Sequence, residues 1–139
     1  MNVQELSDRL ELKELVDKFS NYADTKENDK QVALFTKDAV IEIELGGKIV
    51  FTLHGRDEIK KTFSNSMEDN KIVFHMNGQQ TVEIDGDKAK GIAYSYVTVG
   101  KDEKHLQHEG VRYHDEFQKI DGKWYISHRR SEFMWQEEA

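Results

Sequence analysis

One predicted hairpin brings together a histidine and several tyrosines. These side chains are candidates for proton transfer. The runs on both sides of Asp85-Gly86 are rich in strand-forming residues, and an Asp-Gly step favours a tight two-residue loop. With that loop, His75 lies opposite Tyr96 and Asn77 lies opposite Tyr94. Because imidazole is an acid and a base near neutral pH, this patch is a candidate site for proton transfer.

The face of the sheet to which His75 points is left open by the pattern. Strict alternation along strand 71 to 84 places His75 among polar residues, on the side expected to meet water. Gly78, however, is a position at which a β-bulge could sit, and a bulge exchanges the two faces across it. A longer loop at Asp85-Gly86 would also shift every pairing. Both alternatives remain open at this point.

A second Asp-Gly step, Asp121-Gly122, predicts a hairpin between strands 108 to 120 and 123 to 134. A two-residue loop there sorts the side chains of both strands into two faces. His114 and Arg129 are expected to share one face. The other face is expected to carry Val111, Tyr113, Asp115, Phe117, Trp124, Ile126, His128 and Arg130.

The densest group of possible metal ligands is the run His105-Leu106-Gln107-His108-Glu109, with His114 a few residues later. Two histidines three positions apart point to opposite sides of a strand, so this spacing does not favour a metal site. The chain has no cysteine, no serine-centred nucleophile elbow and no glycine-rich phosphate loop. We therefore expect no metal and no cofactor.

The elements that must position these groups are helical in the front part of the chain and strand-like behind it. Apolar residues recur every three or four positions between Leu6 and Ala23, which predicts a helix of about five turns. A short helix from Asn28 or Asp29 to about 36–38, a hairpin over 40–53 and a short helix around 58–67 should follow. Strands over 71–84, 88–99, 108–120 and 123–134 then complete one α+β domain that spans residues 1–139.

Composition narrows the partners and the location. Lys and Arg number 20 against 27 Asp and Glu, a net charge of −7, and no basic stretch is long enough to follow a phosphate backbone, so nucleic acid is not an expected partner. No apolar run approaches the roughly 20 residues that span a bilayer, and the first residues lack the pattern of a signal peptide. We expect a cytoplasmic protein that does not bind membranes.

Several residue strings, in this order of elements, resemble the SnoaL-like branch of the nuclear transport factor 2-like superfamily, which includes scytalone dehydratase, a bile-acid dehydratase and a dehydrochlorinase. The resemblance covers nearly the whole chain and implies a cone-shaped, strongly curved, mixed or antiparallel sheet wrapped around a long N-terminal helix and two short helices. The strings are Tyr22-Ala23-Asp24, residues 33–39, Phe74-His75-Met76, residues 110–117, Asp121-Gly122-Lys123-Trp124 and His128-Arg129-Arg130.

The resemblance implies a site inside the cone. Asp24 and His75 stand where these enzymes have a catalytic dyad, in which the carboxylate orients the imidazole and the imidazole takes a proton from carbon. Arg129 resembles an arginine that stabilises a leaving group. A second cone histidine has no clear counterpart, and His108 and Tyr96 compete for that place. The substrate-binding residues implied are Tyr22, Asn77, Tyr96, Tyr113 and Arg129.

The function implied is that of a cofactor-independent lyase or isomerase, similar to a dehydratase, that acts on a small, partly apolar carbonyl or hydroxyl compound. The alternative is a non-catalytic module of the same fold that binds a small molecule or serves in assembly, because one fold hosts many functions. The open face of the sheet favours a homodimer or a homotrimer in either case.

Overall fold

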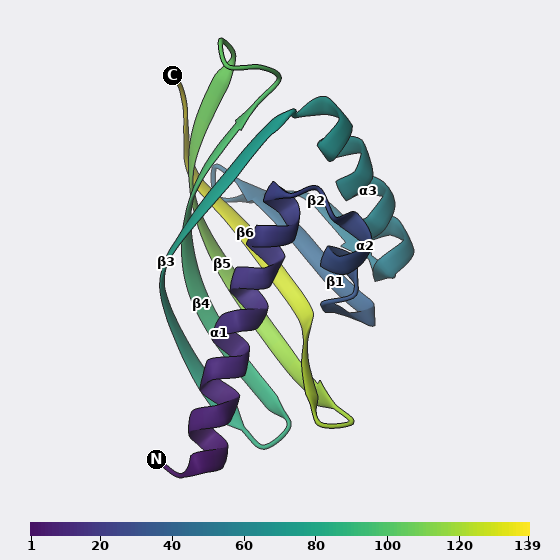
Figure 1. Ribbon diagram of the computed structural model, residues 1–139, viewed down its shortest axis with the longest axis vertical. Helices are drawn as coiled ribbons and strands as arrows, with labels where there is room; N and C mark the ends of the chain where they lie inside the picture. The colour runs from purple at the N-terminus through teal and green to yellow at the C-terminus, as the bar shows by residue number, and fades with distance from the viewer.

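The computed structural model describes residues 1–139 and contains three helices and six strands (Figure 1). The long helix predicted at the N-terminus is present, and the four long strands lie within two residues of the predicted starts and within four of the predicted ends. In chain order the elements are α1 (Val3–Asp24), α2 (Asn28–Val32), β1 (Phe35–Leu45), β2 (Lys48–His54), α3 (Gly55–Asp69), β3 (Ile72–Asp85), β4 (Lys88–Gly100), β5 (Leu106–Ile120) and β6 (Lys123–Glu138).

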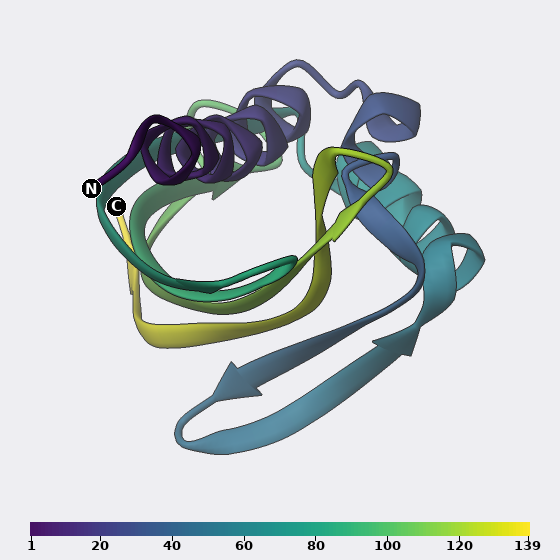
Figure 2. The same ribbon diagram turned by 90° about the horizontal axis from the view of Figure 1, so that it is seen from below.

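The six strands form one sheet in the order β2-β1-β6-β5-β4-β3. All neighbours are antiparallel except β1 and β6, which run parallel. Strands β3 to β6 curl strongly, and α1 lies across the open side of the curl, while the β1–β2 hairpin extends away from it (Figure 2). The predicted α+β class and the curved mixed sheet around a long helix are therefore confirmed.

One expected helix boundary is wrong. Helix α2 ends at Val32, and β1 already begins at Phe35, whereas the prediction continued the helix to about residues 36–38. Phe35 is fully buried and pairs with Ile126 of β6. Burial of this ring in the sheet outweighs the helical spacing of Val32, Leu34 and Phe35.

A β-bulge sits in β3 at Gly78, which is one of the two alternatives that the sequence left open. The register of β3 against β4 shifts between Asn77 and Gln80, so Gly78 and Gln79 interrupt the pairing. The predicted pairings of His75 with Tyr96 and of Asn77 with Tyr94 are wrong, because His75 lies opposite Val97, Asn77 lies opposite Ser95, and the loop consists of Gly86 and Asp87. The bulge exchanges the faces, and His75 consequently points to the concave side together with buried Val97.

A second bulge reverses part of the β5–β6 prediction. The loop at Asp121-Gly122 is as predicted, with Ile120 opposite Lys123. The register shifts after Phe117, which pairs with Ile126, while Glu116 pairs with His128. Beyond this shift the inward positions of β6 are Arg129 and Ser131, so the prediction that Arg129 shares a face with His114, and His128 and Arg130 with Tyr113, is wrong.

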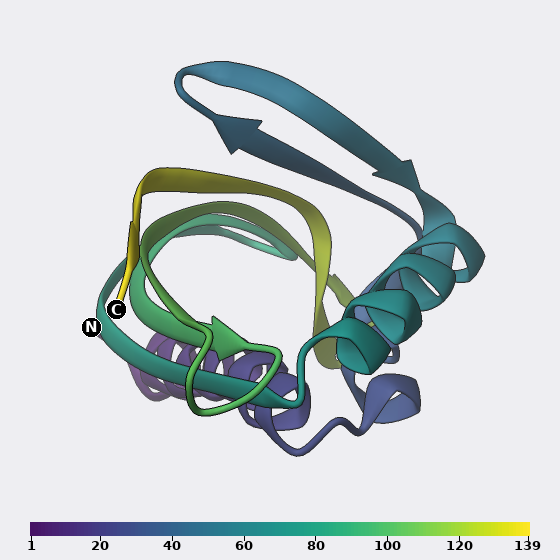
Figure 3. The ribbon, with the colours of Figure 1, turned by 90° about the horizontal axis from the view of Figure 1, so that it is seen from above.

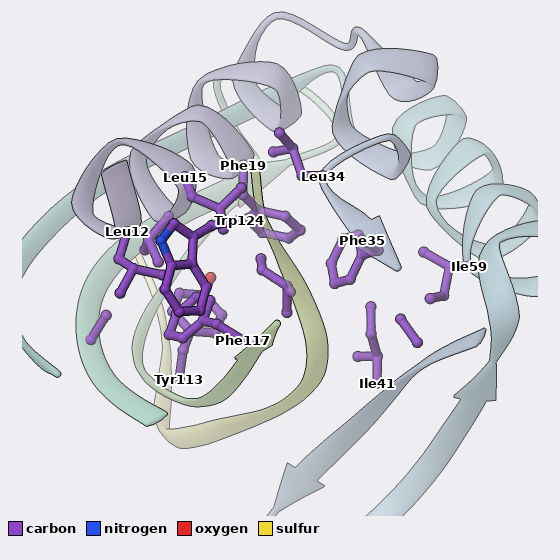
Figure 4. Close-up of a cluster of buried hydrophobic side chains, with 14 of the residues drawn as sticks. Leu12, Leu15, Phe19, Leu34, Phe35, Ile41, Ile59, Tyr113, Phe117 and Trp124 are labelled. Carbon is purple, nitrogen blue, oxygen red and sulfur yellow. The ribbon is translucent and has the colours of Figure 1, made fainter. Parts of the chain in front are cut away.

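The core lies between α1 and the concave face of the sheet. Leu12, Leu15, Val16 and Phe19 follow the three-and-four spacing of one helical face and are buried. Figure 4 shows the α1 side chains meeting aromatic rings from the sheet, and Phe19 contacts Tyr113 edge to face with a centroid distance of 6.2 Å. This packing fixes the C-terminal turns of α1 against the middle of the sheet. No helix of the chain has the length and apolar character needed to cross a membrane.

Candidate active site

The end of α1 and the start of β3 bring Asp24 and His75 together. The Nδ1 atom of His75 lies 2.7 Å from one carboxylate oxygen of Asp24, and the backbone N–H of His75 donates to the other oxygen at 2.9 Å. Lys26, which has a positive φ of 60° after the helix end, donates to the backbone carbonyls of Met67 and Asn70. This ties the end of α1 to the chain just before β3, so the carboxylate meets the imidazole from a fixed direction.

The contact with Asp24 determines which nitrogen of His75 is free. A carboxylate accepts hydrogen bonds, so Nδ1 carries the proton that faces Asp24. The Nε2 atom then has a lone pair, and no protein group forms a hydrogen bond with it. The side chain of His75 is only 9% exposed and lines an apolar cavity. The ring is thus prepared to accept a proton from a molecule in that cavity.

The cavity has a volume of about 400 Å³, within the range of ligand sites in proteins. It lies between the curved sheet, the end of α1, α3 and the β1–β2 hairpin. Figure 3 shows these elements from above, the side on which α1 and α3 both end. Most of its lining is apolar. The lining comprises Phe19, Ala23, Gln31, Ile41, Ile43, Phe51, Leu53, Thr62, Phe63, Ser66, Met67, Asn70, Val73, His75, Val97, Val99, Glu109, Tyr113, Arg129, Ser131 and Phe133.

Arg129 supplies a fixed positive charge at this cavity. Its side chain is completely buried, and two of its guanidinium nitrogens donate to the carboxylate of Asp115 at 2.7 and 3.0 Å. The guanidinium also lies 3.9 Å from the ring centroid of Tyr113 and 4.3 Å from that of Phe19. Its third nitrogen, Nη1, has no partner. The guanidinium is therefore held in one position, and Nη1 is its one nitrogen without an acceptor.

Tyr113 lies next to Arg129 on the concave face and also lines the cavity. Burial raises the pKa of Tyr113 to about 12, even though the charge of Arg129 acts in the opposite direction. The phenol consequently keeps its proton at neutral pH. Its hydroxyl is a hydrogen-bond donor for an oxygen atom in the cavity.

Glu109 is a cavity residue that sequence reasoning did not select. It is 6% exposed, and its Oε2 atom accepts hydrogen bonds from Gln136 at 2.6 Å and from Gln107 at 3.2 Å. Burial raises the pKa of Glu109, although these two hydrogen bonds and the nearby His75 act in the opposite direction. A signal was present in the sequence, because Glu109 continues the alternation of Val111 and Tyr113 on one face of β5.

Comparison with known proteins places the fold in a family. Residues 4–130 match the model of the SnoaL-like domain. The chain belongs to the SnoaL-like domain family, as its residue strings suggested. A protein of Mycobacterium tuberculosis, uncharacterized protein Rv2910c, is 31% identical over 133 residues, which cover 93% of this chain and 87% of that protein.

Solved structures with the same fold are more distant in sequence. A candidate scytalone dehydratase from Novosphingobium aromaticivorans superposes with a TM-score of 0.89 at 18% identity, over 100% of this chain and 92% of the other. The hexachlorocyclohexane dehydrochlorinase LinA-type3 from Novosphingobium barchaimii gives a TM-score of 0.87 at 17% identity, over 100% and 94% of the two chains. At these identities the similarity establishes the shared cone-shaped fold alone.

Three residues expected to bind substrate do not line the cavity. Tyr22 points to the other side of α1, where Lys30 lies 5.9 Å from its ring centroid. Asn77 is inside the cone but is held by Asp17 and Ser20 of α1. Tyr96 is exposed on the convex face, one position out of register with His75. Tyr22 lies two residues before Asp24 and therefore on a different side of α1. The β3 bulge explains why Tyr96 does not share the face that carries His75.

The histidine run of β5 does not form a metal centre. His108 points to the convex face, where its Nδ1 lies 2.8 Å from the Thr98 hydroxyl and its ring stacks on Tyr96. His108 and Tyr96 therefore do not supply a second histidine-like group inside the cone. No group of three or more histidine, aspartate or glutamate side chains is arranged to hold a metal ion.

Proposed function

We propose that this protein is a cofactor-independent lyase or isomerase that removes a proton from carbon in a small, partly apolar carbonyl or hydroxyl compound. The observation that carries the proposal is the His75–Asp24 pair, with a 2.7 Å contact at Nδ1 and a free Nε2 at an apolar cavity. An isolated carbonyl-binding pocket has no need of such an oriented base. Two structurally similar proteins have names that describe eliminations, dehydration and dehydrochlorination, which is consistent with this reaction class.

In the proposed first step, Nε2 of His75 takes a proton from a carbon atom next to a carbonyl group. The imidazolium that forms is stabilised by the carboxylate of Asp24. The negative charge that develops on the carbonyl oxygen is stabilised by a hydrogen bond from the hydroxyl of Tyr113 and by the positive charge of Arg129, whose guanidinium lies 3.9 Å from the centroid of the Tyr113 ring. The chain's own side chains provide every group for this step.

The alternative of a binding module without catalysis predicts a different lining. A cavity of apolar side chains alone, with His75 turned outward, would suit a ligand that is only held. Here His75, Glu109 and Arg129 all line the cavity beside its apolar residues. Ionisable groups are costly to bury and are retained where they act, so this lining favours a reaction over storage.

A generic probe tests the proposed base without knowledge of the natural substrate. Nitrobenzisoxazole releases a coloured phenolate when a base removes the single C–H proton of its isoxazole ring and the N–O bond breaks, and its aromatic body suits an apolar cavity. We expect the protein to catalyse this reaction and His75→Asn to lower the rate by roughly 10²–10⁴-fold, the usual contribution of a general base.

His105 offers a matched control. Its Nδ1 also lies 2.7 Å from an aspartate oxygen, that of Asp102, but the side chain is 69% exposed on the β4–β5 loop and lies outside the cavity. His105→Asn should leave the rate unchanged. Equal rates for the wild type, His75→Asn and His105→Asn would rule out His75 as the base.

A further inference from the structure

Glu109 and His75 project from strands two apart into the same cavity. His75 lies opposite Val97, and Val97 lies opposite Glu109, so the three residues form one row across β3, β4 and β5. Neighbouring strands are about 4.8 Å apart, which separates the backbones of His75 and Glu109 by roughly 10 Å. A small molecule above Val97 would touch both side chains.

The carboxyl group of Glu109 is the unusual member of the buried acids. Asp8 is paired with Lys119 and Asp115 with Arg129, but no lysine or arginine contacts Glu109. Both of its hydrogen bonds, from Gln107 and Gln136, go to Oε2, and Oε1 has no partner. A buried carboxyl without a cation favours its neutral form, and burial does raise the pKa of Glu109.

We propose that Glu109 is the general acid that protonates a departing hydroxyl group, so that the substrate is a β-hydroxy carbonyl compound and the product an α,β-unsaturated carbonyl compound and water. This inference rests on the proposed function of His75. A hydroxide ion is a poor leaving group and needs a proton as it departs, whereas a halide does not. An acid placed in the row of the base therefore indicates elimination of water.

The step balances within the site. Nε2 of His75 takes the proton on the α-carbon, the C–H electrons form the C=C bond, and the C–O bond to the β-carbon breaks. The leaving oxygen takes the proton from Oε1 of Glu109 and departs as water. The reaction leaves an imidazolium at His75 and a carboxylate at Glu109, and transfer of one proton from the first to the second through water restores both groups.

Two probes separate this inference from the proposed function. Glu109→Gln keeps an amide oxygen to accept from Gln107 and Gln136 but has no proton to give. For a β-hydroxy ketone of similar size to nitrobenzisoxazole, we expect the variant to lose roughly 10²–10⁴-fold in the rate of water elimination. Turnover of nitrobenzisoxazole, whose phenolate leaves without a proton, should persist and also shows that the variant is folded.

The pH dependence supplies a second readout. With the β-hydroxy ketone, the rate should fall at high pH as Glu109 loses its proton, and this limb should be absent with nitrobenzisoxazole. The exposed Glu103 provides the control, since Glu103→Gln should change neither reaction.

The outcomes are distinct. If Glu109→Gln eliminates water as fast as the wild type, Glu109 is not the acid, while the role of His75 stands. If wild type turns over nitrobenzisoxazole but no β-hydroxy ketone of a varied series, the substrate class is wrong. If wild type turns over neither probe, the proposed function itself has failed.

Discussion

The carboxylate of Asp24 does two tasks with its two oxygens. One oxygen meets the ring of His75, and the other accepts from the backbone N–H of the same residue. The ring and the strand that carries it are thus held by a single group at the end of α1. Orientation of a base by a fixed second group is the arrangement on which general-base catalysis depends, so the precision of this site comes from one residue rather than from a loop.

At the same scale, Glu109 should make stability depend on pH. Burial raises its pKa above the ordinary value of 4.5, with Gln136, Gln107 and His75 acting in the opposite direction. As pH rises, the unfolded chain releases this proton first, so the contribution to stability is complete below that value and is lost as pH rises through the folded pKa. Glu109→Gln should therefore raise the thermal unfolding midpoint at about pH 7, and the gain should vanish toward about pH 4.

Glu103→Gln is the comparison for this measurement, because Glu103 is exposed. A gain for Glu109→Gln that stayed constant from acid to neutral pH would mean that ionisation of Glu109 is not its origin.

Glu109 also marks what a sequence can tell about single residues. Asp24 and His75 were selected through their strings, and the structure brings them together. Glu109 sits in a polar run of two histidines and a glutamine, which is typical of a solvent-exposed loop, and only the alternation with Val111 points inward. Burial of a carboxyl depends on partners from other strands, here Gln136 of β6, and the sequence does not place those.

At the scale of elements, the strand positions were predictable and their faces were not. Strand residues and Asp-Gly turns are local features, so they identified both hairpins. The two bulges are not local to a motif. Gly78 offered a hint of the first, but nothing around Ser127 announced the second, and the skipped pairing there turns Arg129 inward. These two register shifts decide which side chains reach the cavity.

The attachment of α1 to the sheet gives a prediction for this scale. Oδ1 of Asp8 accepts from the indole N–H of Trp124 and from the Lys119 ammonium, each at 3.0 Å, inside the core. Burial would raise the pKa of Asp8, but hydrogen bonds from Trp124, Lys119 and Gln4, with the charge of Lys119, hold that pKa below its usual value of 3.8. The ionised carboxylate therefore stabilises the folded state.

Asp8→Asn should lower the free energy of unfolding by about 1.5–3 kcal/mol at neutral pH, the usual range for hydrogen bonds to a charged group. The difference from wild type should be complete above the ordinary pKa and shrink as pH falls through the lowered one, because both side chains are then uncharged. Urea unfolding at several pH values measures this. Glu14→Gln, on the exposed side of α1, should have almost no effect. Equal losses for the two variants would show that the buried carboxylate does not anchor the helix.

At the scale of the whole molecule, the curl of the sheet creates two unlike surfaces. The concave surface is covered by α1 and holds the cavity. On the convex surface, Met76 lies opposite Tyr96, Tyr96 opposite Gly110, and Gly110 opposite Trp135, so one row crosses β3 to β6. Met76, Tyr96 and Trp135 are all exposed, and the rings of Tyr96 and Trp135 lie 5.9 Å apart. Gly110 is required there, because a Cβ at this position would meet the indole of Trp135 at 2.3 Å.

A continuous apolar row on an open sheet is typical of a surface that another protein chain covers. A second copy of this chain presents the same row, so two copies can bury both rows in one symmetric contact; of the homodimer and the homotrimer expected from the sequence, this contact favours the homodimer. Sedimentation equilibrium of the wild type gives the number of copies.

Met76→Glu, which places a charge in the row, should shift the protein to monomers; Leu10→Glu, an equally drastic change at an exposed position of α1, should not. Because Met76 points away from the cavity, the monomeric variant should still turn over nitrobenzisoxazole, whereas a wild type that sediments as a monomer would contradict the expectation that this face is covered by another copy.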